Sequence, residues 1–181
     1  MLAGPYRCNC WHRTQAATAV KNLISTLEGN DEQTGELNSV IEDISSALQL
    51  VADASEVPTE KQFAGFTQDA IYAATDLANM ATSKVRSAED FAEVAGVTGD
   101  LFGRLLRAAK GAAFACGDEE VKAGILDAVR AVGGAAMRLV ESMKQSVMQP
   151  NDPTNRHKVA QNARAVGAAV TGLISALRAG S

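Results

Sequence analysis

Apolar side chains recur every three or four residues along most of the chain, which is the period of an α-helix. The pattern is clearest over residues 152–179, where most polar side chains fall off the apolar stripe. Asp152 stands where an N-cap is expected, and Pro153 follows at the first helical position, where its missing N–H costs nothing. We therefore predict an amphipathic helix with a broad apolar face. That face consists of Val159, Ala163, Val166, Gly167, Val170, Leu173, Ile174 and Leu177.

The same spacing recurs upstream, over residues 37–52, 91–109 and 125–143. An amphipathic helix of similar length is therefore the repeated unit of the chain. Turn and capping residues divide the pattern into six segments. The sequence Glu28-Gly29-Asn30 is expected to end the first helix, and Asn30 with Gln33 resembles a capping box for the second. The predicted helices are 11–27, 30–55, one opening at 59, 87–116, one opening at 118 and ending before Pro150, and 152–179.

Short connections between these segments favour antiparallel neighbours. We therefore predict an all-α, antiparallel up-and-down helical bundle of five long helices plus a shorter N-terminal helix. The bundle is expected to occupy residues 12–181, after an irregular lead-in over residues 1–11.

Composition agrees with helix packing. The chain has 181 residues, of which 46% are hydrophobic and 4% aromatic, so its core must be aliphatic and rich in alanine. The formal net charge of −4 is an ordinary balance and argues against non-specific nucleic-acid binding. No apolar run reaches membrane-spanning length, so membrane insertion is not predicted.

The three cysteines, Cys8, Cys10 and Cys116, do not form a disulfide framework. A reducing compartment is the simpler interpretation, and the N-terminus lacks the apolar stretch of a signal peptide. Cys8, Cys10 and His12 have a spacing that a soft metal can use, but a structural zinc site needs four ligands. We therefore predict no metal site.

Catalytic motifs are missing from the sequence. Glycines 96, 99 and 103 lie in a helical pattern without a preceding strand, so they do not form a phosphate-binding loop. His157 falls off the apolar stripe and is expected to be a solvated surface residue. Glu119, Glu120 and Asp127 are expected to be surface carboxylates, the first two at the positive end of a helix dipole. We predict a non-enzymatic protein without a cofactor.

Two stretches carry a family resemblance: Leu-Leu-Arg-Ala-Ala-Lys-Gly at 105–111, and Asp-Pro-Thr-Asn with the following Ala-Arg-Ala-Val at 152–166. Together with the repeated Ala-rich helix, they resemble the rod of talin, a chain of four- and five-helix bundles, and vinculin and α-catenin have similar helices. The resemblance covers most of the chain after about residue 12. A sixth segment departs from that pattern, so either the first helix is a remnant of a preceding bundle or one predicted break is wrong.

An apolar stripe on a helix is usually the core of its own bundle. The resemblance implies a second use, because talin rod helices of this type are buried vinculin-binding sites that are exposed when the bundle opens. Asn162 and the double glycine at 133–134 depart from the pattern. The matching positions are Ile125, Val129, Val132, Ala136, Leu139, Val140, Met143, Val159, Ala163, Val166, Val170, Leu173, Ile174 and Leu177.

The resemblance thus implies a cytoskeletal adaptor and mechanosensitive linker in the cytoplasm, at the cytoskeleton or at cell-adhesion sites, with a vinculin-like partner. The alternative is a static actin-binding or scaffold bundle. A small-molecule sensor or helical enzyme domain would need polar groups converging between helices, which the stripes do not show. Actin binding is expected to use the basic side chains Arg104, Arg107, Lys110, Arg156, Lys158 and Arg164.

Overall fold

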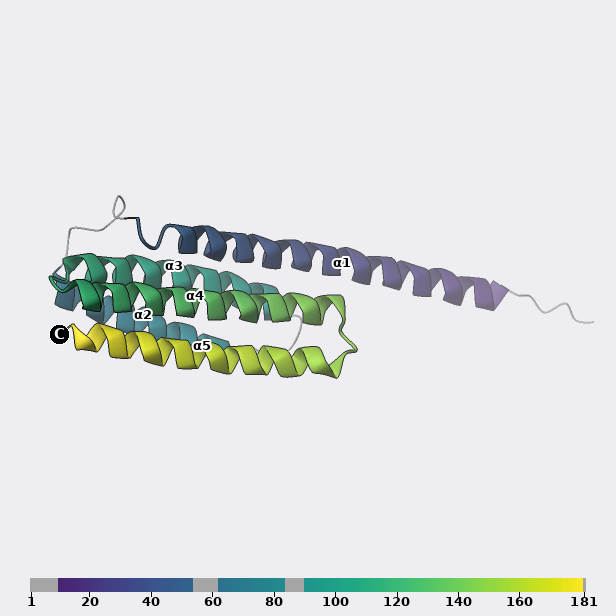
Figure 1. Cartoon of the computed structure of the whole chain (residues 1–181). Coiled ribbons are helices and arrows are strands. Elements are labelled where there is room, and N and C mark those ends of the chain that lie inside the picture. Colours follow the sequence, from purple (N-terminus) through teal and green to yellow (C-terminus); the bar gives the residue numbers. More distant parts are fainter. Residues whose placement is uncertain (1–9, 54–61, 84–89, 181) are drawn as a thin grey trace, which may run out of the picture.

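The computed structural model of the chain describes residues 10–53, 62–83 and 90–180, and within these ranges the regular structure is helical, without strands (Figure 1). The predicted all-α bundle is confirmed. The separate short N-terminal helix is wrong, because the first two predicted segments form one helix. The helices are α1 (Cys10–Gln49), α2 (Phe63–Ser83), α3 (Phe91–Ala115), α4 (Glu119–Met148) and α5 (Pro153–Ala179).

Helix α1 runs without interruption through Gly29 and Asn30, where the sequence predicts a stop. The Thr34 hydroxyl donates a hydrogen bond of 2.6 Å to the carbonyl oxygen of Asn30, one helical turn earlier. Extending a helix adds one backbone hydrogen bond per residue, whereas a new helix must be nucleated again. The cost of one glycine, about 1 kcal/mol, is therefore smaller than the cost of a break. Cys10 and Trp11 already belong to α1, and residues 1–9 lie outside the described residues.

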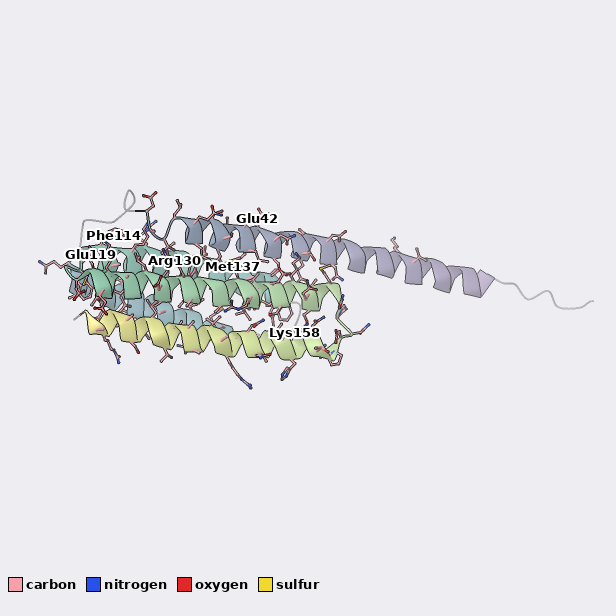
Figure 2. The ribbon with its side chains drawn as sticks, viewed as in Figure 1. Glu42, Phe114, Glu119, Arg130, Met137 and Lys158 are labelled. Carbon is pink, nitrogen blue, oxygen red and sulfur yellow. The ribbon has the colours of Figure 1, made fainter. Side chains whose placement is uncertain are left out.

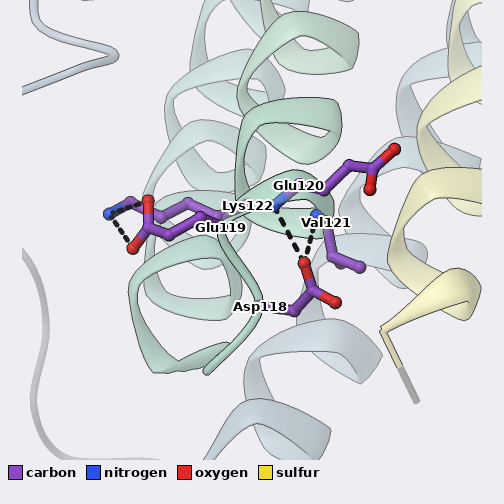
Figure 3. A network of polar contacts seen from close by, with 5 residues as sticks. All are labelled: Asp118, Glu119, Glu120, Val121 and Lys122. Atoms are coloured by element: carbon purple, nitrogen blue, oxygen red, sulfur yellow. Dashed lines mark hydrogen bonds and ion pairs between the residues drawn. The ribbon is translucent and has the colours of Figure 1, made fainter.

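Caps define the first residues of α4 and α5. The sequence predicts the cap at Asp152, whereas at Asp118 it predicts only that a helix begins. The carboxylate of Asp118 accepts hydrogen bonds from the backbone N–H groups of Glu120 (2.9 Å) and Val121 (3.2 Å) (Figure 3). The carboxylate of Asp152 accepts one from the N–H of Thr154 at 2.8 Å. These bonds satisfy N–H groups that have no partner inside the helix. The breaks predicted near Pro58 and Ser87 lie outside the described residues.

Helices α2 to α5 form a closed ring, in which α3 packs between α2 and α4, and α5 packs between α4 and α2. Helix α1 packs on the outside of this ring, against α3 and α4, and its N-terminal part projects past the ends of the other helices (Figure 1). Val40 of α1 lies beside Gly99, and Leu50 lies beside Lys110, so α1 runs parallel to α3. Consecutive helices alternate in direction, as predicted for an up-and-down bundle.

Aliphatic and alanine side chains fill the core, as the composition predicts, and Phe102 is the largest side chain that is fully buried there. Charged side chains cover the outside, among them Glu42 on α1 and Lys158 on α5 (Figure 2). Glycine brings α2 and α3 close together at one point, since a Cβ atom on Gly111 would lie 2.5 Å from the ring of Phe66. Among the described residues, no helix combines the length and the apolar character needed to cross a membrane.

Candidate partner-binding site

The predicted binding face of α4 lies wholly inside the bundle. All seven of its side chains have no exposed surface, and α4 packs against α1, α3 and α5. The face is aliphatic throughout, so it contributes contact area and no acid, base or nucleophile. Its members are Ile125, Val129, Val132, Ala136, Leu139, Val140 and Met143.

The predicted face of α5 is buried in the same way, with one exception. Ile174 is partly buried and packs against the edge of the core. The other six side chains are buried, and α5 packs against α4 and α2. Both candidate faces therefore belong to one continuous core, and a partner reaches them only if helices separate. The six are Val159, Ala163, Val166, Val170, Leu173 and Leu177.

Two asparagines hold α4 and α5 in register. The side-chain amide of Asn162 donates to the carbonyl oxygen of Arg138 at 3.0 Å, and that of Asn155 donates to the carbonyl oxygen of Gln145 at 3.3 Å. Donors and acceptors are each seven positions apart, in opposite directions along the chain, which fits an antiparallel pair. Asn162, a departure from the expected apolar pattern, thus bonds across the helix pair. Sequence reasoning missed Asn155, although two asparagines seven residues apart on one helix face were a usable signal.

One predicted actin-binding cation is not on the surface. Lys110 is 4% exposed, and its Nζ donates to the carbonyl oxygen of Leu50 at 3.0 Å. It therefore serves the contact between α3 and the end of α1. The other five cations are exposed, namely Arg104, Arg107, Arg156, Lys158 and Arg164.

A hollow of about 610 Å³ lies between α2 and α3. Its floor is apolar and includes Phe66 and Ala108, whereas the exposed side chains of Tyr72, Arg104 and Arg107 stand at its edge. Its lining contains no histidine, cysteine or serine, so it lacks the usual pairing of a nucleophile with a base. Asp69 and Asp100 also line the hollow, so acidic and basic side chains both border it.

His157 is exposed in the first turn of α5, as predicted. Among the described residues, no three histidine, cysteine, aspartate or glutamate side chains lie close enough together to hold a metal ion. The sequence cluster of Cys8, Cys10 and His12 lies outside the residues whose side chains are described.

Comparison with known families gives a match over most of the chain. The sequence fits the family model of the talin IBS2B domain over residues 12–179. The match begins in the first turn of α1 and ends at the last residue of α5, so it spans all five helices.

Proposed function

Because the chain belongs to the talin IBS2B domain family, we propose that α4 and α5 are concealed binding helices for a vinculin-like partner. The family membership confirms the predicted talin resemblance. It makes the chain a talin-like domain of the cytoskeletal adaptor kind, which is structural rather than enzymatic. In this proposal the domain acts in the cytoplasm, at cytoskeletal or cell-adhesion sites, and has no catalytic role.

The observation that carries the proposal is the burial of both apolar faces in one helix pair. A helix whose apolar stripe is continuous over several turns can enter a groove on a partner, with anchors at the same three- and four-residue spacing. In the closed bundle, neither stripe is available. Binding must therefore include the free energy of opening, so the intact domain binds more weakly than the isolated helix.

Mechanosensing follows from the same arrangement. A pulling force favours the open, longer state, and the partner then binds the released helix and prevents closure. The domain acts in this way as a linker whose binding face depends on load.

The test compares the binding of a vinculin head domain to the intact chain and to two peptides, 118–148 and 152–179. At least one peptide is expected to bind more than tenfold more tightly than the intact chain, because only the peptide avoids the opening cost. In the peptide 152–179, Val166→Asp and Leu173→Asp should each abolish binding, since each places an unpaired charge in an apolar groove.

Thr171→Asp is the matched control, because Thr171 is exposed on the opposite side of the same helix. It should leave peptide binding nearly unchanged. Equal affinity for the chain and the peptides would show that nothing is concealed. Absence of binding by both peptides would leave only a static scaffold.

Actin binding is the second candidate, and the charge of α5 favours it. This helix carries Arg156, Lys158, Arg164 and Arg178 but no aspartate or glutamate, in a chain whose net charge is −4. Its outer face is therefore a positively charged strip suited to an acidic filament. Filament binding through these side chains should weaken as salt is added.

Co-sedimentation with actin filaments tests this candidate. Lys158→Glu with Arg164→Glu should abolish sedimentation. The sequence also assigns Arg104 and Arg107 to actin binding, but the positively charged strip places the proposed site on α5, so Arg104→Glu with Arg107→Glu, on α3 across the ring, should have little effect. Equal losses with both pairs would indicate a response to net charge alone and would argue against a site on α5.

A further inference from the structure

The attachment of α1 differs from that of the other helices. Each helix of the α2 to α5 ring packs between two ring neighbours, so the ring closes without α1. The extensive contacts of α1 within the described residues are with α3 and α4. Among the α1 side chains that the structure describes, at residues 20–21 and 29–49, Leu37 and Ile44 are buried, and Val51, two residues beyond the helix, continues this seven-residue spacing. We call residues 37–51 the docking segment.

The surface beneath the docking segment is shaped to receive a helix. Gly133 of α4 leaves a hole for Leu48, because a Cβ atom there would lie 2.5 Å from Leu48 Cδ2 and 2.7 Å from Phe102 Cζ. Gly99 of α3 leaves a second, shallower one, since its Cβ would lie 3.2 Å from Val40 Cγ1. Two glycines on different helices thus permit close approach of the same third helix.

Lys110 favours one orientation of the docked helix. Its buried ammonium group meets the carbonyl oxygen of Leu50, just beyond the last residue of α1. The same carbonyl oxygen accepts a hydrogen bond from the backbone N–H of Asp53 at 3.1 Å, so Lys110 adds a second donor at the helix end, which carries partial negative charge. A cation at that place favours a helix that ends there over one that begins there.

We propose that the groove between α3 and α4, formed by Gly99, Phe102, Gly133 and Lys110, is a helix-docking site that α1 covers in the closed domain. Its occupant in trans is an amphipathic helix of a partner protein that places an aliphatic side chain in the hole at Gly133 and ends at Lys110. The site differs from the proposed vinculin-binding faces, because neither α4 nor α5 has to leave the ring. Departure of the docking segment alone opens it.

A fluorescent peptide of residues 34–53 is the probe, and the full chain is the receptor. In the wild-type chain, the tethered α1 competes at high effective concentration, so the peptide should bind weakly. Leu48→Ala in the chain weakens the tethered α1 and leaves Gly99, Phe102, Gly133 and Lys110 unchanged. The peptide is expected to bind this variant about tenfold more tightly than the wild-type chain, measured by fluorescence anisotropy.

Further substitutions in the Leu48→Ala chain locate the bound peptide. Gly133→Ala fills the hole and should weaken binding about tenfold. Gly134→Ala, on the same helix but facing outward, should leave the affinity unchanged. Lys110→Met should weaken binding about fivefold, because it removes the cation at the end of the helix. It also gives a second test of the site if the Gly133→Ala chain fails to fold.

Any of four results would overturn the proposal. The first is that the peptide fails to bind a Leu48→Ala chain that circular dichroism shows to be folded. The second is that the peptide binds the wild-type chain and the variant equally. The third is that Lys110→Met and a folded Gly133→Ala chain both leave the affinity for the peptide unchanged. A dimer of the variant that the peptide does not dissociate, seen by analytical ultracentrifugation, would assign the groove to a second copy of the chain instead and also overturn it.

Discussion

At the residue scale, Thr67 of α2 is a buried polar side chain whose hydroxyl oxygen has no hydrogen-bond partner among the described residues. A buried hydroxyl without a partner lowers stability by about 1–3 kcal/mol relative to a paired one. Thr67→Val keeps the branched shape and removes the hydroxyl. We expect the free energy of unfolding to rise by about 1 kcal/mol and the Tm by about 2–4 °C, measured by calorimetry.

Thr75→Val is the matched control on the same helix. Thr75 is exposed, and its hydroxyl already donates to the carbonyl oxygen of Ile71 at 2.7 Å. Its replacement should change the Tm little. A Thr67→Val protein that is less stable than wild type would show that the hydroxyl is satisfied in solution.

Asp152 gives a prediction about pH. Hydrogen bonds from Thr154 lower the pKa of Asp152 below its ordinary value of 3.8, and Lys158 adds a smaller effect in the same direction. A carboxyl group whose pKa is lowered by folding contributes stability above its unfolded pKa and loses it as the pH falls through the folded value. Asp152→Asn keeps a capping side chain without the charge. Wild type should be more stable than this variant at about pH 5, and the difference should disappear on acidification below the folded pKa.

The measurement is chemical denaturation of both proteins over a series of pH values. Other carboxyl groups titrate in both proteins, so only the difference between the two curves reports on Asp152. A difference that stays constant down to about pH 2 would rule out a contribution from its ionised form.

At the element scale, the adjacent glycines of α4 are expected to respond in opposite ways. Gly134→Ala places a methyl group in ordinary contact, 3.6 Å from Arg138 Nη1, and should stabilise the domain by up to about 1 kcal/mol through helix propensity. Gly133→Ala should destabilise it by about 1–3 kcal/mol, because the methyl group overlaps Leu48 and Phe102. Urea denaturation measures both. A stabilised Gly133→Ala protein would mean that α1 shifts away at little cost.

Helix boundaries are predictable from sequence where the deciding interaction is local. Asp118 and Asp152 bond to N–H groups two or three residues ahead, and both helices begin where the sequence predicts. The same local capping rules wrongly predict that one helix ends at Gly29 and another begins at Asn30. Whether a glycine ends a helix depends also on the cost of starting another helix. The apolar stripes of α4 and α5 are core, as their period indicates.

The residue roles that the sequence does not reveal depend on contacts between distant segments. Lys110 looks like a surface cation until α1 is placed beside α3, since its acceptor, Leu50, is 60 residues away. Gly133 looks like a weak point in a helix until Leu48 fills the space above it. The local spacing of residues predicts neither role, because each depends on which helices become neighbours.

At the scale of the whole molecule, two classes stand out among the helical glycines. A Cβ atom on Gly111 or Gly133 would lie within 3.0 Å of a side chain of another helix, so the close approach offsets the helix-propensity cost. Gly96, Gly124 and Gly172 have no such neighbour within 4 Å, so their cost is not offset by packing. The soft bundle that the glycine content suggests therefore remains a prediction, with its weak points at the second class.

The order of opening is the last prediction. Local opening free energies range from near zero up to the global value, and segments with few buried contacts open first. Helix α1 is held through its docking segment, whereas α4 packs against three helices. In hydrogen exchange followed by mass spectrometry, amides of residues 37–49 should therefore exchange through a lower-energy opening than those of 129–140. Leu48→Ala should speed exchange in α1 by about tenfold and leave α5 unchanged.

Ser46→Ala, at an exposed position of α1, is the control and should not speed exchange. If α1 and α4 instead exchanged at one rate and responded equally to denaturant, the five helices would form a single cooperative unit. An early release of α1 would mean that the groove is uncovered before the ring opens, whereas in a single cooperative unit both would happen together. The groove between α3 and α4 would be uncovered first, while the faces of α4 and α5 that the asparagines hold in register would be uncovered only when the ring itself opens.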